Sequence, residues 1–224
     1  MKTTVVTGAT SSIGRNIVID LLKSEQTVHA FVRDKLKANE CLPVDNKNLH
    51  ILHFDNVESI DSLDETFKKI SKNFNIQNLI CCHGSHSFKL VSHVDIEHIN
   101  KLLFDNFTST VMYVKSFSNL RNKEKNNRSI ILFGSTAAIK GEAGISIYSA
   151  AKSSLISFTA SVSKELARKK IRINTVSPGW VESERSKENE NTLGLKRIKN
   201  IESFYPMGFG SPDDISGLVS FLIT

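Results

Sequence analysis

Cysteine, which cross-links secreted proteins and binds zinc, is scarce in this sequence. It occurs only at Cys41, Cys81 and Cys82. An odd, low cysteine count without a secretory leader is typical of proteins in a reducing compartment. No His and Cys spacing resembles a zinc site, so we expect no metal. Apolar runs fall short of the ~18 residues that cross a bilayer. These absences predict a cytoplasmic protein with no membrane partner.

A dense basic tract is also lacking, although 29 Lys and Arg against 23 Asp and Glu give a formal net charge of +6. The densest cluster, Arg168, Lys169 and Lys170, falls where a helix is expected to end, and cations stabilise that end. Aromatic residues do not interleave with basic ones, as single-stranded nucleic acid would require. We therefore expect no nucleic acid partner; a steep salt dependence of DNA or RNA binding would contradict this.

Apolar, β-branched runs alternate with longer amphipathic segments along the 224 residues. The runs predict strands at 3–7, 27–32, 49–54, 78–82, 129–134 and 171–176, and the segments predict helices near 14–24, 59–73, 96–121, 147–169 and 212–222. This alternation is typical of a Rossmann-type α/β fold, a single doubly wound parallel sheet with helices on both faces. A 40% hydrophobic content fits one domain over 1–224.

One polar, weakly periodic segment, 182–203, stands apart from this alternation. A disordered surface loop and a mobile lid over a site both fit its composition. Its position after the SPGW turn favours the flexible, substrate-side lid.

The first predicted strand runs into TGATSSIGR, where Gly8 and Gly14 bracket a turn that opens a helix. Glycine lets backbone N–H groups approach a pyrophosphate, and a helix N-terminus carries partial positive charge. The spacing differs from G-x-G-x-x-G, so the turn alone also fits a plain strand-to-helix connection.

A second pattern joins Ser135, in ILFGSTAA, to Tyr148 and Lys152, in YSAAK. Residues four apart lie on one face of a helix. Each residue alone has a structural explanation, because serines cap turns and helical tyrosines pack with a wet tip. Together, downstream of a phosphate-binding turn, they predict a tyrosine acid whose proton is tuned by the lysine cation.

These motifs resemble, in order and spacing, the short-chain dehydrogenase/reductase family. TGATSSIG resembles the TGxxxGxG loop of that family, with Ser12 in place of the middle glycine. HFDNV, FDNF and NTVSPGWVES also resemble family segments, with Ser183 where threonine is usual. The likeness covers essentially the whole chain and is strongest to 3-oxoacyl-[acyl-carrier-protein] reductases.

The resemblance implies roles for the matching positions. Tyr148 is then the proton donor in reduction, Lys152 also holds the nicotinamide ribose, and Ser135 hydrogen-bonds the substrate oxygen. Asn106 holds a water that relays protons. The cofactor contacts that follow are Gly8, Thr10, Ser11, Ser12, Ile13, Gly14, Arg15, Arg33, Asp55, Asn56, Gly84, Tyr148, Lys152, Pro178, Gly179, Val181 and Ser183.

The second predicted strand ends in FVRD, which bears on the choice of nucleotide. Where the family carries an acid that selects NAD, this chain has Val32, and Arg33 follows at once. A guanidinium pairs bidentately with a 2′-phosphate, and Arg15 offers a second charge. A solvated Arg33 paired with Asp34 is the structural alternative. The missing acid and the arginine together predict NADP(H) as the cofactor.

The chain departs from the family at two places. The usual Asn-Asn-Ala-Gly after the fourth strand is Cys81-Cys82-His83-Gly84 here, so His83 and nearby His86 either titrate near neutrality at the cofactor or are ordinary loop histidines. The sequence also stops before the family's usual last strand. We therefore expect a sheet without that strand, and a homodimer through helices 96–121 and 147–169 instead of a tetramer.

The resemblance predicts an NADP(H)-dependent oxidoreductase that reduces a carbonyl to an alcohol, with a 3-oxoacyl thioester as one substrate. A basic surface would suit an acidic carrier protein. A sugar, polyol or other small-alcohol dehydrogenase is the near alternative, and a non-catalytic nucleotide-binding sensor or scaffold is the more distant one. Ile139, Glu142 and Trp180 are the candidate substrate-pocket residues.

Overall fold

The computed structural model describes residues 2–55, 60–121, 128–183, 186 and 201–224. Six parallel strands form one sheet in the order β3-β2-β1-β4-β5-β6. The strands are β1 (Thr3–Thr7), β2 (Thr27–Val32), β3 (Leu49–His53), β4 (Ile76–Cys81), β5 (Arg128–Phe133) and β6 (Ile171–Val176). The strand order reverses between β1 and β4, and ligands of such sheets bind at that point, beyond the carboxyl ends of the strands.

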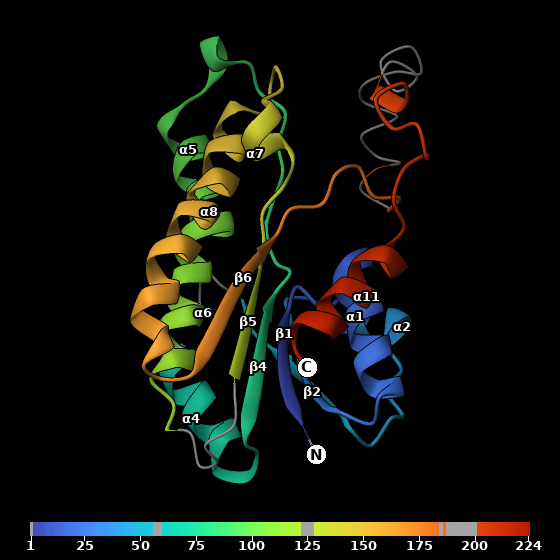
Figure 1. The fold of residues 1–224 in the computed structure, drawn as a ribbon, viewed down its shortest axis with the longest axis vertical. Coiled ribbons are helices and arrows are strands. Elements are labelled where there is room, and N and C mark those ends of the chain that lie inside the picture. The colour runs from blue at the N-terminus through green and yellow to red at the C-terminus, as the bar shows by residue number, and fades with distance from the viewer. Residues whose placement is uncertain (1, 56–59, 122–127, 184–185, 187–200) are drawn as a thin grey trace.

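Helices cover both faces of the sheet (Figure 1). One face carries α1 (Ser12–Lys23), α2 (Lys35–Cys41) and α11 (Pro212–Leu222), and the other carries α4 (Leu63–Asn73), α5 (Ile96–Leu103), α6 (Ser109–Ser118) and α8 (Ser146–Ala167). Short turns are η1 (Ile60–Ser62), η2 (Val91–His93), η3 (Phe104–Thr108) and α7 (Ala137–Lys140). None of the helices in the described part of the chain has the length and hydropathy needed to cross a membrane.

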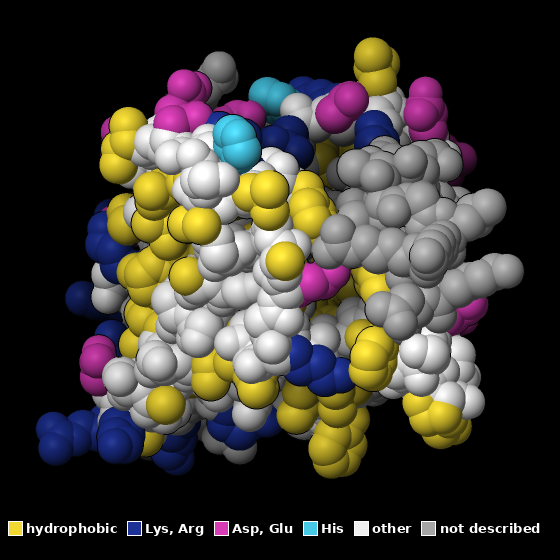
Figure 2. Space-filling view, turned by 90° about the horizontal axis from the view of Figure 1, so that it is seen from above, with side chains coloured by type: hydrophobic (Ala, Val, Ile, Leu, Met, Phe, Trp, Pro, Cys, Tyr) yellow, Lys and Arg dark blue, Asp and Glu magenta, His cyan; other side chains and the backbone are white. Residues whose placement is uncertain are grey.

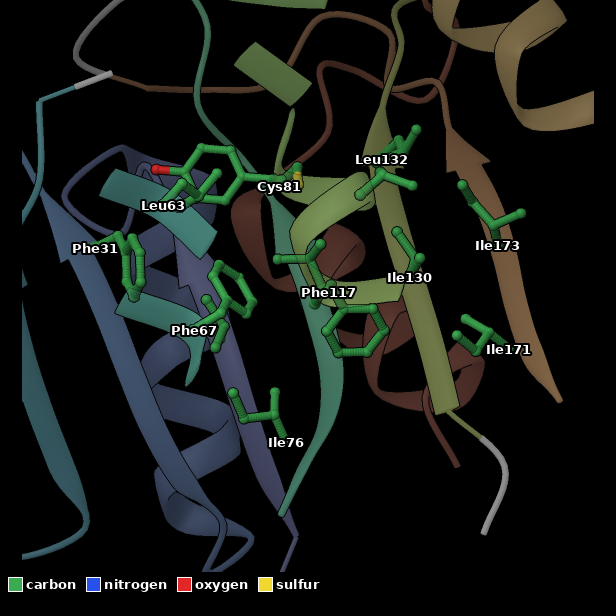
Figure 3. Packing of buried hydrophobic residues seen from close by; sticks show 14 of the residues in the cluster. Phe31, Leu63, Phe67, Ile76, Cys81, Phe117, Ile130, Leu132, Ile171 and Ile173 are labelled. Atoms are coloured by element: carbon green, nitrogen blue, oxygen red, sulfur yellow. The ribbon is translucent and has the colours of Figure 1, made fainter. Parts of the chain in front are cut away.

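Two apolar cores hold these layers together. Phe67 of α4 and Phe117 of α6 are fully buried against the sheet on one face (Figure 3). On the other face, Ile17 of α1 and Val219 of α11 pack against a second buried cluster. Because both faces are covered, the β1, β2 and β5 strands are buried along their whole length.

The expected doubly wound sheet is confirmed, and its strands lie within two residues of their predicted bounds. The helix expected near 96–121 is confirmed over 96–118, and the π-helical segment η3 lies within it, between α5 and α6. The short α2 was not predicted, and Asp34 starts it by accepting hydrogen bonds from the backbone N–H groups of Leu36 and Lys37.

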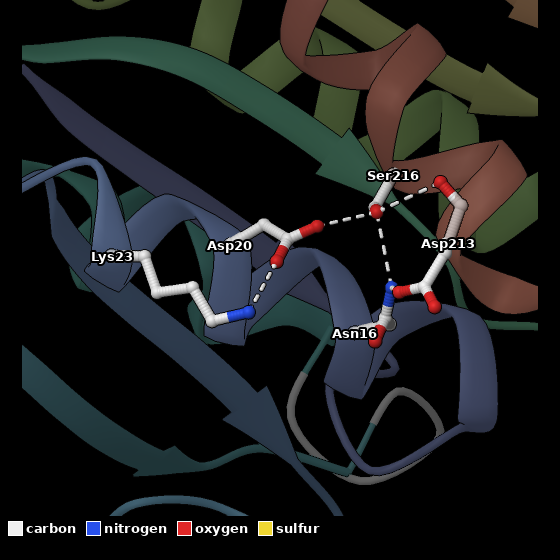
Figure 4. A network of polar contacts seen from close by, with 5 residues as sticks. All are labelled: Asn16, Asp20, Lys23, Asp213 and Ser216. Carbon is white, nitrogen blue, oxygen red and sulfur yellow. Dashed lines mark hydrogen bonds and ion pairs between the residues drawn. The ribbon is translucent and has the colours of Figure 1, made fainter.

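The last helix is bound to the first by a polar network (Figure 4). Asn16 Nδ2 donates to Asp213 Oδ1 at 2.8 Å, and Ser216 Oγ donates to Asp20 Oδ2. Lys23 pairs with the same Asp20 at 3.2 Å. Because α1 begins at the carboxyl edge of the sheet, this network helps to hold the N-terminus of α1 in place.

Candidate active site

A cavity of about 1170 Å³ opens at the carboxyl ends of the strands. The loops after β1, β2, β4, β5 and β6 contribute to its wall, together with the start of α8. Figure 2 views the molecule from this end, where hydrophobic, basic and histidine side chains are all exposed. The cavity is large enough for a dinucleotide and a small substrate together, since drug-sized ligands fill about 300–1000 Å³.

At Gly8, the loop after β1 has a backbone geometry that only glycine allows. Gly8 has a φ of +62°, and a Cβ there would lie 2.6 Å from the backbone nitrogen of His83. Ser11 Oγ donates to the Gly8 carbonyl at 2.8 Å and accepts from Gly14 N at 3.1 Å, which closes the turn and caps α1. Ser12 is the first residue of α1 and does not have a positive φ, so it needs no glycine.

This loop fits the pyrophosphate of a dinucleotide. The cavity wall includes Gly8, Thr10, Ser11, Ser12 and Ile13 at the start of α1. A side chain at Gly8 would occupy space against the loop after β4, so the glycine keeps the backbone accessible. Backbone N–H groups at a helix start attract anions, and the chemistry of the site therefore matches the expected ligand.

After the end of β2, both Arg33 and the acidic Asp34 line the cavity. Arg33 lines the cavity, and so does Lys37 of α2, which sequence reasoning missed. Asp34 Oδ1 is bound to the N–H groups of Leu36 at 2.8 Å and Lys37 at 3.1 Å, so this carboxylate serves as the helix cap. No ion pair joins Arg33 to Asp34.

Of two further cofactor contacts expected from the sequence, one lines the cavity and the other does not. Asp55 lines the cavity as expected. Arg15 does not line it, because it lies on α1 beyond the residues that face the cavity. Lys37 is therefore the second cation that lines the cavity at this end, in addition to Arg33. Asn56 lies outside the described residues.

The nicotinamide end would lie beside Ser135, Tyr148 and Lys152, which all line the cavity. Lys152 is 6% exposed, and its Nζ donates to the Phe133 carbonyl at 2.8 Å and lies 5.8 Å from the centre of the Tyr148 ring. Ser135 Oγ accepts from Ala137 N at 3.1 Å, which leaves its own O–H available to donate. The α8 helix thus places a phenol and an ammonium on one face, next to a serine after β5.

Asn106 is fully buried in the π turn and does not line the cavity. Its Nδ2 donates to the Ser85 and Leu102 carbonyls, each at 2.9 Å. Its Oδ1 is buried and has no hydrogen-bond partner in the described part of the chain. A Cβ at Gly84 would lie 2.5 Å from that oxygen and 3.3 Å from Lys152 Nζ, so glycine at this position lets the asparagine and the lysine approach each other.

The histidine that follows the two cysteines is a structural link. His83 contacts Thr7 Oγ1 of β1 through Nδ1, and its Nε2 lies 3.0 Å from Ser109 Oγ and 3.2 Å from Thr110 Oγ1. Burial and the nearby Lys152 cation lower the pKa of His83 to about 3. His83 is therefore neutral near pH 7 and neither titrates there nor behaves as an ordinary loop histidine.

The two neighbouring cysteines are uncharged packing residues. Burial raises the pKa of the Cys81 thiol to about 12 and that of Cys82 well above its usual value. Because the thiolate is the reactive form, neither side chain is a nucleophile at neutral pH.

The substrate end of the cavity is rich in aromatic side chains. Trp180 stacks on Phe209 at 5.3 Å between ring centres, and the backbone N–H of Trp180 donates to Tyr205 Oη at 3.1 Å. Glu142 and Trp180 line the cavity as expected, whereas Ile139 is 79% exposed and does not. Pro178, Gly179, Val181 and Ser183 also line it. Most of the expected lid, 182–203, lies outside the described residues.

Comparison with known protein families matches residues 2–194 to the family described as short chain dehydrogenase. The chain belongs to the short chain dehydrogenase family. It is therefore an oxidoreductase by family, and the expected family membership is confirmed.

Relatives within the short chain dehydrogenases match almost the whole chain. Carbonyl reductase family member 4 of Xenopus tropicalis is 29% identical over 225 residues, which cover 99% of this chain and 91% of that protein. The 3-oxoacyl-[acyl-carrier-protein] reductase of Bos taurus is 29% identical over 224 residues, with the same coverage. That of Rickettsia prowazekii is also 29% identical and is covered over 88% of its length.

Solved short chain dehydrogenase structures share the fold. ElxO with NADP bound superposes with a TM-score of 0.89 at 24% identity, over 100% of this chain and 91% of that one. An actinorhodin polyketide ketoreductase with NADPH has a TM-score of 0.88 at 22% identity, over 100% of this chain and 90% of the other. These likenesses confirm the Rossmann-type fold.

Proposed function

We propose that this chain is an NADP(H)-dependent reductase that converts a carbonyl to an alcohol. The observation that carries the proposal is the convergence of Ser135, Tyr148 and Lys152 on the cavity that also contains the phosphate-binding loop and Arg33. Relatives named as carbonyl and 3-oxoacyl reductases support the same activity.

The chain's own residues supply the proton and stabilise the charge. When bound, the reduced nicotinamide supplies the hydride. Tyr148 donates a proton to the substrate oxygen, and the Lys152 ammonium stabilises the phenolate that remains. The Ser135 hydroxyl donates to the same substrate oxygen, since its acceptor side is already bound to Ala137 N. The Phe133 carbonyl holds Lys152 in place by accepting from its Nζ.

Asn106 is suited to a role behind the site. Its buried Oδ1, which has no hydrogen-bond partner among the described residues, lies next to Gly84 and close to Lys152. A buried amide oxygen with no protein partner is a good acceptor for an ordered water. We expect that water to connect Lys152 to solvent and to return a proton to Tyr148 after each turnover.

Two cations account for the proposed preference for NADP(H). Arg33 and Lys37 line the cavity where the ribose end of the dinucleotide would lie, and Asp34 is engaged as a helix cap. A 2′-phosphate would pair with both cations, whereas a 2′-hydroxyl gains little from them. Val32, at the position of the missing acid, is 2% exposed and offers no hydrogen bond.

The first test is a parallel titration with NADPH and NADH, followed by nucleotide fluorescence. We expect Arg33→Ala and Lys37→Ala each to weaken NADPH binding about tenfold and to leave NADH binding almost unchanged. Lys35→Ala is the matched control, because Lys35 is on the same helix but does not line the cavity. Equal losses for the two nucleotides would refute the 2′-phosphate contact.

The proposed substrate class is a 3-oxoacyl thioester. The aromatic end of the cavity, formed by Trp180, Phe204 and Tyr205, suits an acyl group better than a sugar. The net charge of +6 would favour an acidic carrier protein as the donor. Reduction of acetoacetyl-coenzyme A, measured against oxidation of sugars and polyols with NADP⁺, tests this choice. Nucleotide binding without any turnover would favour a non-catalytic sensor or scaffold.

We further propose that the chain acts as one domain and forms a homodimer through α5, α6 and α8. The Phe107 ring of η3 meets the Phe158 ring of α8 edge to face at 5.8 Å between ring centres, and Ile156 of α8 is 36% exposed. A second copy would cover this face. The segment 182–203 is proposed as a lid, and its resistance to proteolysis should rise when cofactor and substrate are bound.

A further inference from the structure

His86 lies next to Tyr148 but has no part in the mechanism described above. The two rings meet edge to face, with centres 4.8 Å apart and planes at 72°. His86 also lines the cavity, so its ring is part of the wall around the phenol. This edge-to-face geometry is the one that aromatic pairs prefer.

The segment that contains His86 is held on both sides. On one side, the Ser85 carbonyl accepts a hydrogen bond from Asn106 Nδ2 at 2.9 Å. On the other side, the Lys89 N–H donates to the Gly144 carbonyl at 2.7 Å. The imidazole is therefore presented to Tyr148 by a short segment whose ends are bound to two different parts of the fold.

Phe88 continues the row of rings and ties it to the start of α8. Its ring centre lies 6.0 Å from that of His86. Gly144 has a φ of +87°, and a Cβ there would lie 2.5 Å from Phe88 Cε1, so the phenylalanine packs directly on the glycine backbone. Gly144 is two residues before α8, which carries Tyr148. The same contacts thus position both the tyrosine and the ring that touches it.

We infer that His86 is a positioning residue for Tyr148, and that it acts through its aromatic ring and not through its nitrogens. The phenol must meet the substrate oxygen at hydrogen-bond distance, and a small misplacement of a reacting group is costly. Without the ring at residue 86, the Tyr148 side chain gains freedom to leave that position. Only the kinetic consequence of this inference depends on the proposed function.

Three substitutions separate the ring from the polar groups. We expect His86→Phe, which keeps a ring, to retain kcat for acetoacetyl-coenzyme A within about twofold. We expect His86→Ala and His86→Asn, which keep no ring, to lower kcat about tenfold with an unchanged Kd for NADPH and an unchanged Tm. An alanine variant with normal kcat would overturn the inference. So would an asparagine variant that is active when the phenylalanine variant is not.

A second readout does not need turnover. The chain has three tyrosines, Tyr113, Tyr148 and Tyr205, so fluorotyrosine-labelled protein gives a simple ¹⁹F NMR spectrum. Loss of one resonance in Tyr148→Phe assigns it. We expect the transverse relaxation of the Tyr148 resonance to slow in His86→Ala, as the ring becomes mobile, and to stay as in the wild type in His86→Phe. Unchanged relaxation in the alanine variant would overturn the inference, even if no substrate is turned over.

Discussion

A histidine in the core makes the stability of this protein sensitive to acid. His29 of β2 is 4% exposed, and neither ring nitrogen has a hydrogen-bond partner in the described part of the chain. Its ring stacks on His50 of β3 at 4.7 Å and meets Phe74 at 4.8 Å. Burial, followed by the charge of His50, lowers the pKa of His29 from 6.5 to about 4.

The loss of stability can be worked out from that pKa. The folded state keeps His29 neutral until the pH falls to about 4, whereas the unfolded chain protonates it near 6.5. Between these values the unfolded state binds more protons, so the free energy of unfolding falls as the pH falls, by up to ~1.4 kcal/mol per pH unit. From pH 7 to pH 5, His29 alone should remove about 2 kcal/mol. Its contribution is fully present only above the unfolded pKa.

The variant that tests this is His29→Phe, which keeps an aromatic ring without a titratable group. Urea unfolding of both proteins at pH 7 and pH 5 gives the difference in stability. We expect the variant to be at least as stable at pH 7, because two unbonded ring nitrogens are removed from the core. Its advantage should grow by about 2 kcal/mol at pH 5.

The comparison isolates His29, since the lowered pKa of His83 affects both proteins equally. His53→Phe is the matched control, because it makes the same substitution at an exposed position on the neighbouring strand. It should show no gain at pH 5. If the difference between wild type and His29→Phe were the same at both pH values, the side chain would not be held neutral by burial.

Three further outcomes are expected. Tyr148→Phe should abolish turnover and leave the NADPH Kd within about twofold in fluorescence titration, and a large loss of binding would contradict its role as proton donor. Gly8→Ala should lower Tm and weaken NADPH binding, because its Cβ would meet the His83 backbone at 2.6 Å at a φ of +62°; normal binding would refute the close approach. Ile156→Glu should shift the protein from dimer to monomer in light scattering, and an unchanged mass would place the interface elsewhere.

Much of the fold was predictable because its signals are local. Buried parallel strands are continuous β-branched runs, so β1, β2 and β6 were placed with the bounds that the structure has. The helix near 96–121 was predictable from its apolar pattern, but the π-helical segment within it was not. Asn106, within that segment, donates to the Ser85 carbonyl in a loop that is remote in the sequence. The α2 helix was missed because it has only seven residues and begins with a cap rather than an apolar pattern.

The sequence by itself determined the order of the strands and helices, the family, and the residue types at the reaction centre. Spacing alone put Tyr148 and Lys152 on one helical face. Only the tertiary structure decided that Asp34 caps a helix and that Lys37 and not Arg15 lines the cavity. It also decided that His83 contacts Ser109 while His86 touches Tyr148. The physical reason is that a loop side chain takes its direction from the elements that pack against it. Those elements are distant along the chain, and no local pattern records them.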